Sequence, residues 1–120
     1  MRKLDHLALP VADWLASRDW YVGTLGLTVE FEIPERCTAA VRDGFDFTIF
    51  LVQAEAPPRG GSVALWFQVD DVDATHAELS ARGARFNHAP AKMFWGYGAE
   101  LADPDGHLIR LWDETSMKAH

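Results

Sequence analysis

The sequence contains a single cysteine, Cys37, so no disulfide can form within the chain. A chain without internal disulfides suits a reducing compartment, and we expect a cytoplasmic location. No apolar segment approaches the roughly 18 residues that a membrane-spanning helix needs. The first residues also lack the apolar core of a signal peptide. We therefore expect no membrane association.

Basic residues are also scarce, because 11 lysines and arginines stand against 18 aspartates and glutamates, for a formal net charge of −7. Proteins that bind nucleic acid draw most of their affinity from lysine and arginine at phosphates. The charge balance therefore disfavours a nucleic-acid partner. A length of 120 residues with 48% hydrophobic residues predicts one globular domain over 1–120. Small molecules and other proteins remain as partners.

One pattern occurs twice in the chain. Residues 6–13 (HLALPVAD) and residues 64–71 (ALWFQVDD) are alternating runs that end at an aspartate, and each precedes an amphipathic stretch that ends in Leu-Gly or Arg-Gly. Alternation predicts a strand, and the aspartates Asp13 and Asp71 are suited to cap a following helix. The copies lie about 58 residues apart, and a unit of that size must pair with another to bury its hydrophobic face.

Each copy predicts a βαβββ module. In the first module, about 3–53, we expect strands over 4–11, 27–33, 37–42 and 45–52 and a helix over 13–25. In the second, about 63–114, we expect strands over 63–69, 84–87, 98–102 and 107–112 and a helix over 72–82. Residues 54–62 contain Pro57-Pro58 and Gly60-Gly61 and are expected to form the linker.

The paired modules, the Val-x-Asp helix starts, the Leu-Gly helix end and the turn Asp103-Pro104-Asp105-Gly106 resemble the vicinal oxygen chelate superfamily. This superfamily includes glyoxalase I, extradiol dioxygenases, fosfomycin-modifying enzymes and bleomycin-resistance proteins, and the resemblance covers about Lys3 to Glu114. It implies an α+β fold in which paired βαβββ modules form a curved mixed sheet around a cavity. The helices would lie on the outer face, and a homodimer would commonly complete the cavity.

The resemblance also implies where a metal would be bound. Metal-dependent members place His or Glu ligands on the first and last strands of each module. Here these positions read His6, Thr48, Ala64 and Arg110, with Thr48 placed by aligning Asp43-Gly44 with Asp105-Gly106. Alanine and guanidinium cannot donate an electron pair to a cation, and the arginine would repel one. We therefore predict no metal site of the family type and no cofactor.

Strand parity predicts which side chains line the cavity, because successive residues of a strand point to opposite faces. The cavity side mixes aromatic, small and polar side chains, which is typical of a small-molecule pocket. Residues 94–98, which are spaced by glycines, add candidates for its rim. The predicted ligand-binding residues are Thr48, Phe50, Trp66, Gln68, Trp95, Tyr97, Arg110 and Trp112.

Two interpretations stay open for several of these residues. Trp66 and Trp112 either form a stacking wall for a ligand or simply fill the cavity. Arg110 either binds an anionic group or pairs with a nearby acid such as Glu100. His6 is either a catalytic general base or a hydrogen-bonding residue of the cavity wall.

Two classes of function follow. The favoured one is a metal-free protein that resembles bleomycin-resistance proteins and sequesters an aromatic or cationic drug or metabolite without chemistry, as in antibiotic resistance. The alternative is a glyoxalase-like or dioxygenase-like lyase or isomerase that uses His6 with Arg110 as an electrostatic clamp. The sequence does not identify the ligand or substrate.

Overall fold

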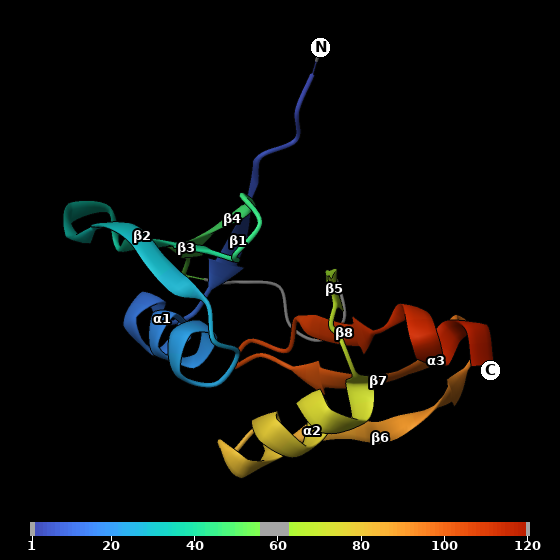
Figure 1. Ribbon diagram of the computed structural model, residues 1–120. Coiled ribbons are helices and arrows are strands. Elements are labelled where there is room, and N and C mark those ends of the chain that lie inside the picture. The colour runs from blue at the N-terminus through green and yellow to red at the C-terminus, as the bar shows by residue number, and fades with distance from the viewer. Residues whose placement is uncertain (1, 56–62, 120) are drawn as a thin grey trace. The chain divides into compact units, whose positions relative to one another are not determined.

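Each half of the chain folds around its own four-stranded mixed sheet, as the repeated pattern predicts (Figure 1). The computed structural model describes residues 2–55 and 63–119. The halves form two compact units, Met1–Pro58 and Arg59–His120, and both are α+β units of the expected βαβββ order. Most of the predicted linker, residues 56–62, lies outside the described residues.

The first unit consists of one helix and four strands with a short connecting turn of helix. Its elements are β1 (His6–Val11), α1 (Trp14–Gly23), β2 (Thr28–Ile33), the 3-10 helix η1 (Pro34–Arg36), β3 (Thr38–Arg42) and β4 (Thr48–Gln53). The strand order is β1-β4-β3-β2, with β1 parallel to β4 and the other pairs antiparallel. Helix α1 packs against β3 and β4, so one face of this sheet is covered.

The second unit repeats this arrangement and adds a short helix at its end. Its elements are β5 (Ala64–Gln68), α2 (Val72–Ala81), β6 (Phe86–Met93), β7 (Gly96–Ala102), β8 (Leu108–Trp112) and α3 (Glu114–Ala119). The strand order is β5-β8-β7-β6, again with the first and last strands of the module parallel. Helix α2 packs against β6 and β7.

The predicted aspartate caps are confirmed at both main helices. The carboxylate of Asp13 accepts hydrogen bonds from the backbone N–H groups of Leu15 and Ala16 at 3.1 Å. Asp71 accepts one from Ala74 at 3.0 Å. These bonds satisfy N–H groups that have no partner inside the helix, so the aspartates fix where each helix begins.

Most of the predicted helix-side positions on β1, β4 and β8 are confirmed as buried, whereas Leu65 and Phe67 on β5 are only partly buried. The residues assigned to the helix side are at most 3% exposed at six positions, which are Leu9, Val11, Ile49, Leu51, Ile109 and Leu111. On the opposite face, by contrast, Trp66 is 46% exposed. The helix side of each sheet therefore supplies the hydrophobic core, and the opposite face of the second sheet leaves Trp66 exposed.

The strands β6 and β7 are longer than predicted. We expected strands over 84–87 and 98–102 with a loop between them, but β6 continues to Met93 and a two-residue turn, Phe94-Trp95, leads directly into β7. The alternating pattern fails here because the register shifts twice along β6. Pro90 is tolerated because β6 is an edge strand, where one side needs no ladder hydrogen bond.

The expected alignment of the two modules is wrong by two residues in the last strand. The Thr48 N–H donates to the carbonyl of Asp5 at 3.1 Å, and the Leu108 N–H donates to the carbonyl of Val63 at 2.9 Å. These bonds are equivalent, so Thr48 corresponds to Leu108. Arg110, two residues further along, therefore corresponds to Phe50 and not to Thr48.

The preceding turns explain the error. The Asp43 carboxylate accepts hydrogen bonds from the N–H groups of Phe45 and Phe47 at 2.8 and 3.0 Å. Asp103 makes the same two bonds, both 2.9 Å long, in the turn before β8. The first aspartate thus organises each turn, whereas the alignment had matched the Asp-Gly pairs.

Candidate functional site

A row of side chains crosses the second sheet on its open face. Trp66 on β5 pairs with Arg110 on β8, Arg110 with Glu100 on β7, and Glu100 with His88 on β6. Residues paired across neighbouring strands lie side by side on one face. The row therefore places an arginine between an indole and a carboxylate.

Arg110 and Glu100 form a largely buried ion pair. The Nε–H of Arg110 donates to Oε2 of Glu100 at 2.9 Å, and the side chains are 19% and 16% exposed. Asn87 donates to the other carboxylate oxygen at 3.0 Å. Burial raises the pKa of Glu100, but the hydrogen bonds from Asn87 and Arg110 outweigh burial, and the pKa lies below its ordinary value. The structure thus contains the pairing that the sequence offered as one role of Arg110.

Two tryptophans surround the same arginine. The rings of Trp66 and Trp95 meet edge to face, with centroids 4.7 Å apart and an interplanar angle of 80°. The guanidinium carbon of Arg110 lies 5.0 Å from the centroid of Trp66 and 5.7 Å from that of Trp95. Contacts of these kinds contribute roughly 0.5 to 2 kcal/mol each.

Trp95 occupies this place because β7 carries a glycine beside it. A Cβ atom at Gly98 would lie 2.5 Å from the Cη2 atom of Trp95 and 2.2 Å from the carbonyl oxygen of Leu111. The glycine spacing was expected to leave room for a ligand or a bulge. At Gly98 this space is occupied by the indole of Trp95. The absence of a side chain at Gly98 therefore allows Trp95 to pack next to Trp66 and Arg110.

Two further predicted residues belong to the same face. Trp112 follows Arg110 by two residues on β8 and pairs with Gln68 on β5 and Gly98 on β7. The amide nitrogen of Gln68 donates to Glu114 at 3.1 Å. We call Trp66, Trp95, Arg110 and Trp112 the aromatic face of the second unit.

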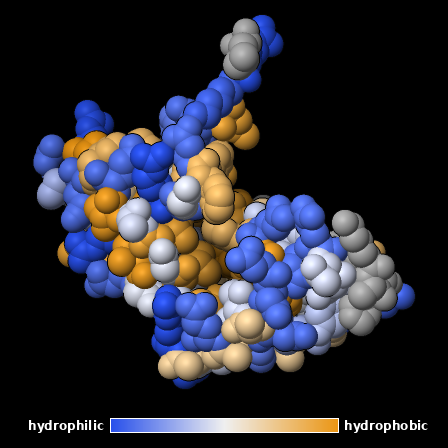
Figure 2. All heavy atoms as spheres, in the orientation of Figure 1, coloured by the Kyte–Doolittle hydropathy of each residue, from blue (hydrophilic) through white to orange (hydrophobic). Residues whose placement is uncertain are grey.

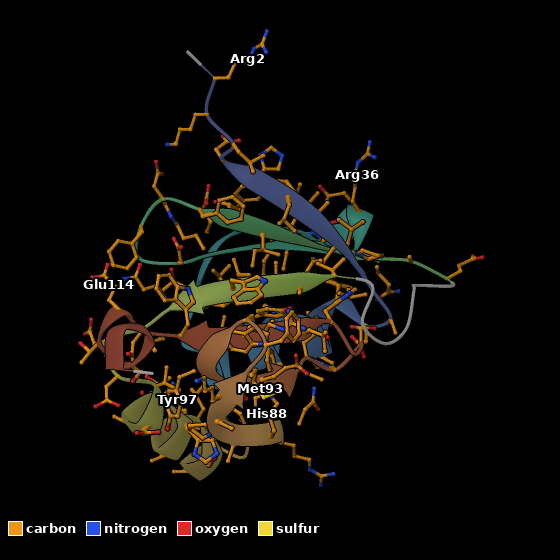
Figure 3. The ribbon with its side chains drawn as sticks, turned by 90° about the vertical axis from the view of Figure 1, so that its right-hand side faces the viewer. Arg2, Arg36, His88, Met93, Tyr97 and Glu114 are labelled. Atoms are coloured by element: carbon orange, nitrogen blue, oxygen red, sulfur yellow. The ribbon has the colours of Figure 1, made fainter. Side chains whose placement is uncertain are left out.

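Tyr97 is not brought together with the aromatic face. Its hydroxyl donates to the carboxylate of Asp73 on α2 at 2.7 Å. Figure 3 labels Tyr97 beside this helix. This hydrogen bond, with a smaller effect of burial, raises the pKa of Tyr97 above its ordinary value. The residue therefore ties β7 to the helix that covers the sheet.

The first unit holds the remaining predicted residues. The ring of His6 stacks on Phe50 with centroids 4.8 Å apart, and Phe31 contacts Phe50 edge to face at 5.5 Å. His6 Nδ1 lies 3.0 Å from the carboxylate of Asp5, and the His6 side chain is 52% exposed. Thr48 is buried and donates to Glu30 at 2.6 Å, so its hydroxyl has a protein partner.

The corrected register changes which residues of this chain occupy the positions where family members hold a metal. They now read His6 and Phe50 in the first unit and Ala64 and Arg110 in the second. Only His6 can donate an electron pair to a cation. Among residues 2–55 and 63–119, no three histidine, cysteine, aspartate or glutamate side chains are grouped as metal ligands would be. The residues present do not fit the family's metal ion.

Two residues that contact Phe50 or Glu100, namely Phe31 and Asn87, were not predicted as site residues from the sequence. Phe31 lies on an edge strand with a register shift, which hides its parity. Asn87 lies in the irregular part of β6 and was assigned only to a short strand. Glu100, by contrast, was named from the sequence as a possible partner of Arg110, and the register of β7 with β8 places it there.

The comparisons with known proteins agree with this architecture. A family model described as the Glyoxalase/Bleomycin resistance protein/Dioxygenase superfamily matches residues 3–111. TnmS3, an antibiotic-binding protein from Streptomyces sp. CB03234, is 32% identical with a TM-score of 0.78, over 94% of this chain and 96% of that one. No match was found among curated proteins.

Two other solved structures share the fold. A superfamily member from Sphaerobacter thermophilus is 25% identical with a TM-score of 0.78, over 95% of this chain and 98% of that one. A superfamily protein from Nocardioides is 22% identical with a TM-score of 0.81, over 94% of this chain and 83% of that one. Within the described residues, no helix has the length and apolar character to cross a membrane. The chain belongs to the Glyoxalase/Bleomycin resistance protein/Dioxygenase superfamily.

Proposed function

We propose that this protein binds a planar aromatic drug or metabolite on the aromatic face without a metal ion and without chemistry. The observation that carries the proposal is the contact of Trp66, Trp95 and Arg110, in which Trp66 remains 46% exposed. An exposed indole that is already held by a second ring offers a rigid surface for stacking. The similarity to TnmS3, an antibiotic-binding protein, supports a drug as the ligand.

Calorimetric titration with planar aromatic compounds, such as substituted anthraquinones, tests the proposal. Trp66→Ala and Trp95→Ala should each weaken binding by about 1 to 3 kcal/mol, which is typical of a buried aromatic anchor. Trp14→Phe, a change in α1 of the first unit, is the matched control and should leave the affinity unchanged. Equal affinities in all four proteins would contradict the proposal.

A second candidate is a lyase or isomerase with His6 as general base. It is favoured by the 3.0 Å contact between His6 Nδ1 and the Asp5 carboxylate, which can orient the imidazole. Arg110, which this candidate needs as an electrostatic clamp, forms an ion pair with Glu100 through Nε. If the protein were such an enzyme, His6→Ala would lower the turnover of 2-oxo acid or related substrates roughly 100-fold or more.

We also infer that the protein acts as a homodimer in the cytoplasm. Apolar residues reach the surface of the first unit over α1, where Leu15 is 42% exposed (Figure 2). Exposed apolar surface of this kind is commonly covered in an assembly. The single cysteine supports the cytoplasm, since no internal disulfide is available.

A further inference from the structure

We propose that the aromatic face prefers planar aromatic ligands that carry an anionic oxygen, such as a carboxylate or phenolate, over neutral or cationic ligands with the same rings. This preference rests on the proposed function of the face. It differs from the expectation of a cationic guest, which came from the overall charge of the chain. The proposed preference for anionic ligands follows from the local arrangement of hydrogen-bond donors and acceptors.

Both oxygens of the Glu100 carboxylate already accept hydrogen bonds from protein side chains. Oxygen Oε1 of Glu100 accepts from Asn87 at 3.0 Å, and Oε2 accepts from Arg110 at 2.9 Å. The side chain is only 16% exposed. A cationic ligand would therefore meet a carboxylate whose negative charge is already paired with Arg110 and which is mostly shielded from solvent.

The arginine retains donors. A guanidinium carries several N–H groups, and within the described residues the structure assigns Arg110 one hydrogen bond, through Nε. The indole N–H groups of Trp66, Trp95 and Trp112 can only donate. The hydrogen-bonding capacity left on Trp66, Trp95, Arg110 and Trp112 is thus donor capacity, and a ligand that uses it must supply acceptors.

The order of the row determines which charge a ligand meets. Trp66 lies on β5, Arg110 on the neighbouring strand β8, and Glu100 one strand further away on β7. A ligand ring stacked on Trp66 would therefore lie closer to Arg110 than to Glu100. Arg110 itself fills the cation position over Trp66 and Trp95, at 5.0 and 5.7 Å from their centroids. A cationic ligand would be repelled there, whereas an oxyanion would receive short, charge-assisted hydrogen bonds from the fork.

Three probes with one ring system isolate the charge. Anthraquinone-2-carboxylate is the anion, anthraquinone-2-carboxamide is its neutral analogue, and 2-(aminomethyl)anthraquinone is the cation. In calorimetric titrations at neutral pH and low salt, the anion should bind the wild-type protein about tenfold more tightly than the amide, as expected for charge-assisted bonds. The cation should bind most weakly.

Arg110→Gln should remove the preference for the anion and leave the affinity for the amide within about twofold, because stacking remains. That variant leaves Glu100 partly buried without its partner, so the double variant Arg110→Gln with Glu100→Gln keeps the pair neutral and tests the same point if the single variant does not fold. Arg82→Gln, which removes an exposed arginine of the second unit, is the control and should preserve the preference.

The outcomes separate the two proposals. Binding of all three probes with equal affinity, or an anion preference that survives in the double variant, would overturn the preference and leave the stacking function intact. Absence of binding by every probe would overturn the proposed function together with the preference. A preference for the anion that is lost with Arg110 and kept in Arg82→Gln supports both.

Discussion

At the scale of residues, Arg110 shows how neighbours define the role of a charged side chain. The sequence identifies it as an arginine on the open face of β8, and parity alone leaves two roles open. The register of β7 places Glu100 opposite it, and the two side chains form an ion pair. The remaining role follows from donors that the pair leaves unused.

Gly98 provides a test at this scale. Gly98→Ala should destabilise the protein by about 1 to 3 kcal/mol, because the new Cβ would clash with Trp95 and the backbone of Leu111. Urea denaturation measures the loss, and near-UV circular dichroism should show a weakened tryptophan signal. Gly44→Ala is the control, since nothing lies within 4 Å of its added Cβ. Similar stabilities of the two variants would contradict the packing described.

The ionisation of Glu100 should make the stability of the folded protein depend on pH. Its pKa in the folded protein lies below the ordinary value of 4.5, so its ionised form is favoured by folding. The stabilisation is therefore present above pH 4.5 and is lost as the pH falls through the lower folded pKa.

At neutral pH, Glu100→Gln should lower the free energy of unfolding by about 1 to 3 kcal/mol, and the difference from wild type should shrink in acid. Urea denaturation over a range of pH measures this. Glu78→Gln, which removes an exposed ion pair with Arg82, should change little at any pH. A difference that stays constant into acid would exclude the ion pair as its cause.

At the scale of elements, Asp113 connects the end of β8 with two helices. Its side chain is 2% exposed and accepts hydrogen bonds from the Val72 N–H at the start of α2, at 2.7 Å, and from the Ser116 N–H in α3. The sequence interpretation assigned the cap of the second helix to Asp71 alone. It had no means of finding Asp113, because that contact joins residues 41 apart.

Asp113→Ala should therefore destabilise the protein more than Asp71→Ala. Loss of an exposed cap costs about 0.5 to 2 kcal/mol. Loss of the buried carboxylate leaves the Val72 and Ser116 N–H groups without this acceptor and should cost about 2 to 4 kcal/mol. Thermal and urea denaturation of both variants compare the two, and an equal loss would show that Asp113 is only a local cap.

The elements also show where the sequence is informative. The strands β1, β4, β5 and β8 and both main helices were predicted because alternation and aspartate caps are local signals. The β6–β7 hairpin was predicted only as two shorter strands, over 84–87 and 98–102, since its register shifts and its Pro90 disguise the period of a strand. Trp95 consequently was predicted as a rim residue but not as the partner of Trp66 and Arg110.

At the scale of the whole molecule, the repeat predicted both units and their shared topology. It did not predict the register of their last strands, because the turns are organised by Asp43 and Asp103, not by the Asp-Gly pairs. Of the candidate site, parity identified the side chains on the open face. The pairs among them depend on cross-strand register, which a single sequence does not encode locally.

The homodimer is a prediction at this scale. Sedimentation equilibrium at micromolar concentration should give twice the chain mass of 13.4 kDa. Replacing Leu15 by Glu should favour the monomer if the apolar surface over α1 is the interface, because burial of the new charge is costly. Phe45→Ser, at an exposed turn, serves as the control. A monodisperse monomer for the wild type would contradict the prediction.

The most direct test of ligand binding is the two-dimensional ¹H–¹⁵N spectrum of the indole N–H groups. The chain has 5 tryptophans, and their signals can be assigned with single Trp→Phe variants. Titration with anthraquinone-2-carboxylate should shift the signals of Trp66 and Trp95, with a smaller effect at Trp112, and leave those of Trp14 and Trp20 in place. Shifts confined to Trp14 and Trp20, or no shift at saturating probe, would contradict a binding site on the aromatic face.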